Sequence, residues 1–246
     1  MSVLNLSGRN LIRIEIEDDG TLVAYLENSE PKRFSLVGVT SLNCPYNQLT
    51  SLPLLPSSLK ALHCPWNHLT SLSLLPRKLE RLYCHENQLT NLPLLPKELK
   101  VLGCSNNQLT SLPLLSRELK ELYCSNNRLS SLPLLPRKLK ELYCSNNQLI
   151  SLPLLPEGLE RLGCSNNQLT SLPSLPESLK MLDCLGNPLK YVQFFKKRPS
   201  YLSVPESLEE EHSVECYQEG YRLQEINRYL FITFFSELRL QLDFLI

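Results

Sequence analysis

The sequence has little glycine and no long run of apolar residues. Only 8 of its 246 residues are glycine, while leucine and proline recur at fixed positions, which excludes a collagen-like or a disordered chain. The longest apolar stretch, residues 229–235, is far shorter than the roughly 18 residues that a membrane helix needs. Residues 1–9 also lack the apolar core of a cleavable secretory signal. We therefore expect a protein without a membrane span that is located in the cytoplasm.

One internal repeat covers most of the chain. Eight cysteines recur at intervals of 20 residues, from Cys44 to Cys184, and an asparagine follows each of them three residues later. A repeat of fixed period indicates a stacked array in which each unit packs only on its neighbours. The sequence therefore predicts an N-terminal cap (1–38), eight repeats (39–191) and a C-terminal cap (192–246).

Each repeat predicts one short strand followed by an extended return segment. Residues 119–129 match the leucine-rich-repeat pattern L-x-x-L-x-C-x-x-N-x-L, in which Leu122 and Cys124 point to the same side of a strand. Residues 130–138 contain two prolines three positions apart, which do not fit inside an α-helix but suit a polyproline-type segment. We expect a leucine-rich-repeat solenoid with a parallel β-sheet on its concave face and extended, polyproline-like segments on its convex face.

The repeat resembles those of known pathogen proteins. Its L-P-x-L-P unit is similar to the short repeats of bacterial effectors of the YopM and IpaH type. Its Cys-Ser-Asn-Asn-Gln-Leu-Thr-Ser-Leu-Pro segment resembles arrays encoded by giant DNA viruses of amoebae. The resemblance covers about residues 39–191 and implies a protein that binds a host protein in the host cytoplasm. IpaH-type effectors also carry a ubiquitin-ligase domain with a catalytic cysteine, but the Cys-x-Asp pattern of that site is absent around Cys216.

The regular cysteines are expected to be reduced and buried. Side chains in register on neighbouring parallel strands are about 4.8 Å apart, which fits poorly with the roughly 3.5–4.5 Å between the Cβ atoms of a disulfide. The spacing also lacks the Cys-x-x-Cys pairs of a zinc site. We therefore predict a core ladder of free thiols, with no metal and no other cofactor. The ladder comprises Cys44, Cys64, Cys84, Cys104, Cys124, Cys144, Cys164 and Cys184.

The regular asparagines are also expected to be structural. Each stands at the turn that leaves a strand, where an asparagine side chain can bond to backbone groups that would otherwise lack partners. The set comprises Asn47, Asn67, Asn87, Asn107, Asn127, Asn147, Asn167 and Asn187.

Outward-facing side chains of the sheet are the predicted binding residues. Aromatic residues stand there beside lysine and arginine, and Tyr, Trp and Arg are typical anchors of protein interfaces. Interleaved glutamates dilute the positive charge, which argues against a nucleic-acid partner. An alternative is that the tyrosines only cover the sheet and the charges form ordinary cross-strand pairs. The predicted partner-binding residues are His63, Trp66, Arg81, Tyr83, Lys100, Lys120, Tyr123, Lys140 and Tyr143.

Both ends of the stack are expected to carry caps, because a terminal repeat exposes its core. Residues 11–17 alternate apolar and charged side chains, and a turn at 18–20 leads into a second extended stretch, which predicts a β-hairpin cap. At the other end, Ser207 precedes a run of acids, and apolar residues recur at helical spacing from Leu223 to Phe234. We expect a mainly helical C-terminal cap there, with self-association through it as an alternative.

The sequence favours binding over catalysis. It contains no phosphate-binding loop, triad signature or cluster of metal ligands. We predict a non-enzymatic scaffold that binds a partner protein through the concave face of its sheet. Two alternatives stay open: a structural, self-assembling array such as a virion component, and an enzyme that uses Cys216 or the C-terminal unit.

Overall fold

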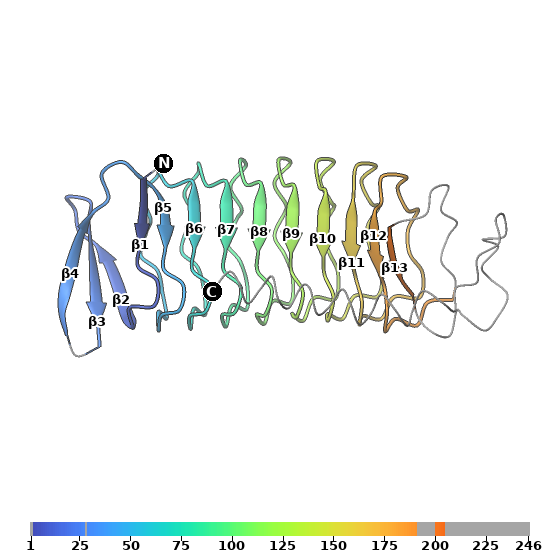
Figure 1. The fold of residues 1–246 in the computed structure, drawn as a ribbon, viewed down its shortest axis with the longest axis horizontal. Coiled ribbons are helices and arrows are strands. Elements are labelled where there is room, and N and C mark those ends of the chain that lie inside the picture. Colours follow the sequence, from blue (N-terminus) through green and yellow to red (C-terminus); the bar gives the residue numbers. More distant parts are fainter. Residues whose placement is uncertain (1, 28, 191–199, 205–246) are drawn as a thin grey trace.

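The chain forms a solenoid built on one long parallel sheet. The computed structural model describes residues 2–27, 29–190 and 200–204. Ten strands stand side by side along the long axis of this part of the molecule, in the order β1-β5-β6-β7-β8-β9-β10-β11-β12-β13 (Figure 1). The prediction of a parallel-sheet solenoid is therefore confirmed.

The register of the sheet follows the period of the sequence. From β5 to β12, each residue pairs with the residue 20 positions later, so that Leu122 lies between Leu102 and Leu142. The main strands are β1 (Ser2–Asn5), β5 (Val39–Asn43), β6 (Ala61–His63), β7 (Arg81–Tyr83), β8 (Val101–Gly103), β9 (Glu121–Tyr123), β10 (Glu141–Tyr143), β11 (Arg161–Gly163), β12 (Met181–Asp183) and β13 (Tyr201–Ser203).

Five apolar positions in each repeat make the core. In the repeat that contains β9, Leu119, Leu122, Cys124 and Leu129 are completely buried, and Leu132 is nearly so. Leu122 and Cys124 point inward because side chains alternate along a strand. Identical residues stack on identical residues in the neighbouring coils, so one continuous hydrophobic cluster runs through the array. Among the described residues, none of the return segments is helical, as the paired prolines predict.

The asparagines tie each coil to the one before it. Asn107 Nδ2 donates to the carbonyl oxygens of Cys104 in its own repeat and Cys84 in the preceding repeat, at 3.1 and 3.0 Å. Its Oδ1 accepts a hydrogen bond from the backbone N–H of Leu89 at 2.9 Å. All eight asparagines repeat this pattern, since the amide always reaches the carbonyl three residues earlier and the equivalent carbonyl one coil back. Polar groups inside the solenoid are thus satisfied without helices.

The eight ladder cysteines are free thiols with no exposed surface. Burial disfavours the thiolate and raises the pKa of Cys84 to about 12, and it raises the pKa of Cys124 well above the ordinary value. Both burial and the high pKa oppose reaction, because the thiolate is the reactive form.

We therefore expect the ladder thiols to resist alkylation in the native protein at pH 8 and to react quickly in denaturant. Peptide-level mass spectrometry after a timed pulse of iodoacetamide measures each cysteine separately. Rapid native labelling of residues such as Cys124 would contradict the buried assignment.

A half-repeat at the N-terminus was not predicted from the sequence. β1 pairs in parallel with β5, and the N–H of Leu6 donates to Asn43 O just as the N–H of Cys44 donates to His63 O. Leu6 is completely buried in the place of a ladder cysteine. A period of 20 residues does not reveal this unit, because Leu6 lies 38 positions before Cys44 and is not a cysteine.

A three-stranded antiparallel sheet follows this half-repeat. It consists of β2 (Leu11–Ile16), β3 (Thr21–Leu26) and β4 (Ser29–Ser35), in that order. Leu11, Ile14 and Leu22 belong to the same hydrophobic cluster as the repeats. The predicted turn at 18–20 joins β2 to β3, and Thr21 N–H donates to Asp19 Oδ1 at 2.8 Å there.

The parallel sheet continues past residue 191, where the repeats were expected to end. β13 pairs with β12 at the usual offset of 20, with Leu202 beside Leu182. The helix predicted after Ser207, the apolar spacing from Leu223 to Phe234 and Cys216 all lie outside the described residues.

Candidate partner-binding face

The outward side of the sheet collects eight of the nine predicted binding residues. We call the outward side chains of β6 to β12, together with the residue before each strand, the sheet face. Lys100, Lys120 and Lys140 directly precede β8, β9 and β10. His63, Arg81, Tyr83, Tyr123 and Tyr143 lie on the strands themselves, whereas Trp66 lies in the turn after β6.

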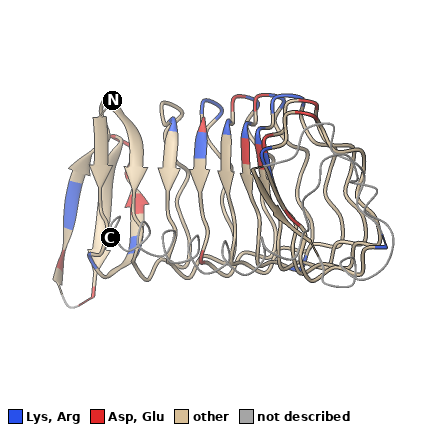
Figure 2. Ribbon diagram, turned by 45° about the vertical axis from the view of Figure 1, so that its right-hand side comes forward, with Lys and Arg blue, Asp and Glu red and all other residues tan. Residues whose placement is uncertain are grey.

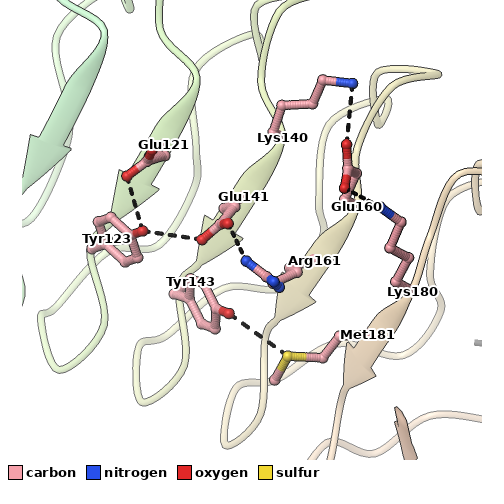
Figure 3. A network of polar contacts seen from close by, with 9 residues as sticks. All are labelled: Glu121, Tyr123, Lys140, Glu141, Tyr143, Glu160, Arg161, Lys180 and Met181. Atoms are coloured by element: carbon pink, nitrogen blue, oxygen red, sulfur yellow. Dashed lines mark hydrogen bonds and ion pairs between the residues drawn. The ribbon is translucent and has the colours of Figure 1, made fainter. Parts of the chain in front are cut away.

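Tyr123 holds together two glutamates of like charge. Its hydroxyl lies 3.1 Å from Glu121 Oε2 and 3.0 Å from Glu141 Oε2, and Glu141 also pairs with Arg161 (Figure 3). Carboxylates directly opposite each other on neighbouring strands repel, and a shared hydroxyl proton reduces that repulsion. Burial raises the pKa of Tyr123, and the two carboxylates raise it further, so the hydroxyl stays protonated and donates.

The tyrosine rings form a half-buried apolar surface beside this network. The rings of Tyr123 and Tyr143 stack with centroids 5.4 Å apart and planes 14° apart. The hydroxyl of Tyr143 reaches the sulfur of Met181, two strands further along, at 3.6 Å (Figure 3). Stacking and hydrogen bonding together hold both rings in one orientation.

Glycine makes room for two of the tyrosines. A Cβ atom at Gly103 would lie 2.9 Å from Tyr83 Cδ1, and one at Gly163 would lie 2.9 Å from Tyr143 Cδ1. Each ring therefore lies over the backbone of the next strand, an arrangement that shields a glycine in a sheet. In the sequence, each of these tyrosines is followed by a glycine 20 residues later. This spacing could have predicted the packing of the ring over the glycine.

Lysines and glutamates share the edge where the strands begin, and Figure 2 shows charges of both signs gathered there. Glu80 pairs with Lys60 at 3.7 Å and Lys100 at 2.6 Å, and Glu160 pairs with Lys140 at 3.4 Å and also with Lys180. These exposed pairs contribute little to stability.

Two cations on the sheet face have no ion pair among the described residues. Lys120 stands between Lys100 and Lys140, whose carboxylate partners lie on their far sides. Arg81 is exposed on β7, beside the half-buried His63, whose ring lies 4.7 Å from that of Tyr83. Burial lowers the pKa of His63, and the nearby Arg81 lowers it further, so the imidazole is neutral at pH 7. Lys120 and Arg81 are thus the two cations of the sheet face whose charge no ion pair within the described residues balances.

The described part of the chain contains neither a metal-binding cluster nor a membrane-spanning helix. No three His, Cys, Asp or Glu side chains there are grouped to hold a metal ion. None of its segments forms a helix long and apolar enough to cross a membrane.

Comparison with known proteins agrees with this architecture. A family model described as leucine-rich repeats (2 copies) matches residues 97–136, 117–157 and 137–176. A search of curated proteins found no match.

Three solved structures share the fold. The leucine-rich effector YopM from Yersinia pestis is 36% identical, with a TM-score of 0.63 over 68% of this chain and 52% of that one. The leucine-rich-repeat domain of a Shigella effector is 33% identical, with a TM-score of 0.55 over 63% of this chain and 72% of that one. The functional domain of InlJ from Listeria monocytogenes, which includes a cysteine ladder, is 32% identical. Its TM-score is 0.56, and the match covers 64% of this chain and 39% of that one.

The chain spans only about half of the YopM chain that it matches. The agreement nevertheless covers most of the Shigella domain and includes the repeat pattern, the parallel sheet and the short coil. This chain belongs to the leucine-rich-repeat family and carries short repeats of the bacterial-effector type.

Proposed function

We propose that the protein is a non-enzymatic scaffold that binds a partner protein through the sheet face. The observation that carries this proposal is the stacked tyrosine pair Tyr123 and Tyr143, with Lys120 directly before the strand of Tyr123. Lys120 has no ion pair among the described residues, and neither does Arg81, which lies two strands away on β7. Aromatic anchors held in place beside available charges are typical of binding hot spots. The partner should present apolar side chains next to carboxylates.

The effector relatives suggest where such a partner is found. YopM from Yersinia pestis is described as an effector protein, and the two chains share repeat length and fold. By this analogy the partner is a host protein and the binding takes place in the host cytoplasm.

We expect the double substitution Tyr123→Ala and Tyr143→Ala to weaken partner binding at least about tenfold, since hot-spot residues each contribute about 2 kcal/mol or more. Proteins captured from a eukaryotic lysate by the wild type are identified by mass spectrometry, then purified and titrated calorimetrically against both forms. Arg137→Ala, an exposed residue outside the sheet face, is the matched control. Equal affinity of the wild type and the double variant would move the binding site away from the sheet face.

A second candidate function, self-association, is favoured by a row of exposed leucines on the return segments. These residues occupy the same position in six consecutive repeats, and their exposed fraction runs from 68% at Leu54 to 82% at Leu154. Contiguous apolar patches of this kind are rare on monomers and mark interfaces. The row comprises Leu54, Leu74, Leu94, Leu114, Leu134 and Leu154. A second copy has the same coil spacing, so two rows would match each other across a two-fold axis.

Under this second proposal the wild type forms dimers or larger species whose fraction rises with concentration. Substituting Leu114→Ser and Leu134→Ser should shift the protein to monomers, while Thr110→Ser on the same segment should not. Light scattering coupled to size exclusion measures the mass. A monomeric wild type at every soluble concentration would refute self-association through this row.

A further inference from the structure

One backbone position in the turn that follows β1 and each strand from β5 to β12 is left-handed. The φ angle is 55° at Tyr46, 57° at Trp66 and 53° at Glu86. The next four repeats place asparagine there, and Gly186 and Gly8 occupy the equivalent places at the ends of the array. Asparagine and glycine tolerate this conformation, whereas bulky side chains do not. Tyr46, Trp66 and Glu86 are therefore not the residues that the backbone favours.

The first two of these side chains form an exposed aromatic stack. The rings of Tyr46 and Trp66 have centroids 5.7 Å apart and planes only 11° apart. Tyr46 is 55% exposed and Trp66 is 45% exposed, so the stack projects from the turns instead of packing into the core. We call Tyr46, Trp66 and Glu86 the turn ridge.

At the end of the stack nearest the N-terminus, the row of turn positions ends in a glycine. The N–H of Gly8 donates to Pro45 O, as the N–H of Tyr46 donates to Pro65 O, which places Gly8 one coil before Tyr46. A Cβ atom at Gly8 would meet nothing within 4 Å. Gly8 therefore adds no side chain to this row, and the aromatic stack begins at Tyr46.

The other end of the ridge carries a carboxylate without a partner. The Glu86 carboxylate has no hydrogen bond and no ion pair among the described residues, although Glu80, Glu118, Glu141 and Glu160 all have ion pairs. Glu86 is only partly exposed, and this burial raises the pKa of its carboxyl group. The asparagines that follow in the row are uncharged, so Glu86 is the acidic member of this line of turns.

We propose that the turn ridge binds an arginine side chain of the partner protein, with the guanidinium against Trp66 and ion-paired with Glu86. The proposal rests on the scaffold function but uses a surface separate from the tyrosine pair. A guanidinium is planar and weakly hydrated, so it stacks on aromatic rings and pairs with a carboxylate through two hydrogen bonds. Lysine lacks the planar group and is expected to bind less well.

The first test selects peptides from a random phage-displayed library on the immobilised full chain. Arginine should be enriched on the wild type, and the enrichment should disappear on Glu86→Gln. Enrichment of acidic or purely apolar peptides, equal arginine enrichment on Glu86→Gln, or no enrichment on the wild type would each overturn the proposal.

The second test uses the fact that Trp66 is the only tryptophan in the chain, so its fluorescence reports on the ridge. A selected peptide should bind at least about tenfold more tightly than the same peptide with citrulline in place of arginine, since citrulline has the shape of arginine without its charge. Equal affinity for the two peptides would contradict a guanidinium site.

Variants that restore the common residue separate binding from folding. Tyr46→Asn and Trp66→Asn install the residue found at position 106, and relief of the left-handed strain offsets the loss of stacking. We expect the thermal midpoint to stay within about 4 °C of the wild type, while calorimetry shows that the arginine peptide no longer binds. Unchanged peptide affinity in both variants would overturn the proposal. The double variant Tyr123→Ala and Tyr143→Ala should still bind the peptide. A result against the sheet-face proposal would therefore leave this test of the turn ridge unaffected.

Discussion

Replacing Asn127 with alanine is expected to destabilise the array by about 3–5 kcal/mol, because one side chain satisfies several buried backbone groups. Asn127 Nδ2 donates to the carbonyl oxygens of Cys104, Cys124 and Ser125 at 3.1 to 3.2 Å. Its Oδ1 accepts from the N–H of Leu109 at 3.0 Å. Alanine fills none of these roles, and water has little access because Asn127 and both cysteines are buried. A buried backbone group left without a partner costs about 1–3 kcal/mol.

Denaturant unfolding followed by circular dichroism measures this loss, and hydrogen exchange at the Leu109 amide locates it. The amide should exchange much faster in Asn127→Ala than in the wild type. Arg128→Ala is the matched control, since the Arg128 side chain is exposed and adjacent in sequence. Its free energy of unfolding should stay within about 0.5 kcal/mol of the wild type. A loss below about 1 kcal/mol in Asn127→Ala would mean that the repeats relax or admit water, and the ladder would not be the main tie between coils.

Leu122→Ala is expected to destabilise the protein by about 3–4 kcal/mol, which is the range for a fully buried leucine in a core that cannot collapse. Leu122 is completely buried and stacks between Leu102 and Leu142 in register. Identical neighbours fix the spacing of the coils, so the cavity cannot close without moving the whole stack. Cys124→Ala removes a smaller side chain from the same core and should cost only about 1–2 kcal/mol.

The same denaturant experiment compares Leu122→Ala with Cys124→Ala. Ile150→Ala is the surface control, because that isoleucine is 64% exposed and lies outside the leucine row. Equal losses for Leu122→Ala and Ile150→Ala would show that the strand leucine is not part of a tightly packed core.

The repeating part of the fold was predictable because each unit meets a near copy of itself. An interval of 20 residues places Leu122 beside Leu142 and Cys124 beside Cys144, so one repeat defines the contacts of the others. Inward and outward positions followed from the alternation of side chains along a strand. The asparagine position also followed, because a turn between stacked strands leaves backbone groups that only a short amide can reach.

The half-repeat at β1 and the strand β13 were not predicted, because neither keeps the features that define the period. β1 contributes Leu6 in place of cysteine at an offset of 38, and β13 follows a break in the pattern at residues 187–189. Tertiary pairing alone placed both strands in the sheet.

The sequence by itself determined the period, the parallel register and the buried ladders, since these depend on residues that recur in every coil. Only the tertiary structure decided which side chains of the sheet face already have a hydrogen-bond or ion-pair partner within the protein. Tyr123 is held by Glu121 and Glu141, whereas Lys120 has no ion pair within the part of the chain that the structure describes. The stacking of Tyr46 on Trp66, next to a Glu86 carboxylate that has no ion pair among the described residues, was also visible only in the structure. The physical reason is that these contacts join different residue types on neighbouring coils. Which contact forms depends on the rotamer of each side chain and on which of several neighbours it can reach. A repeat pattern specifies neither.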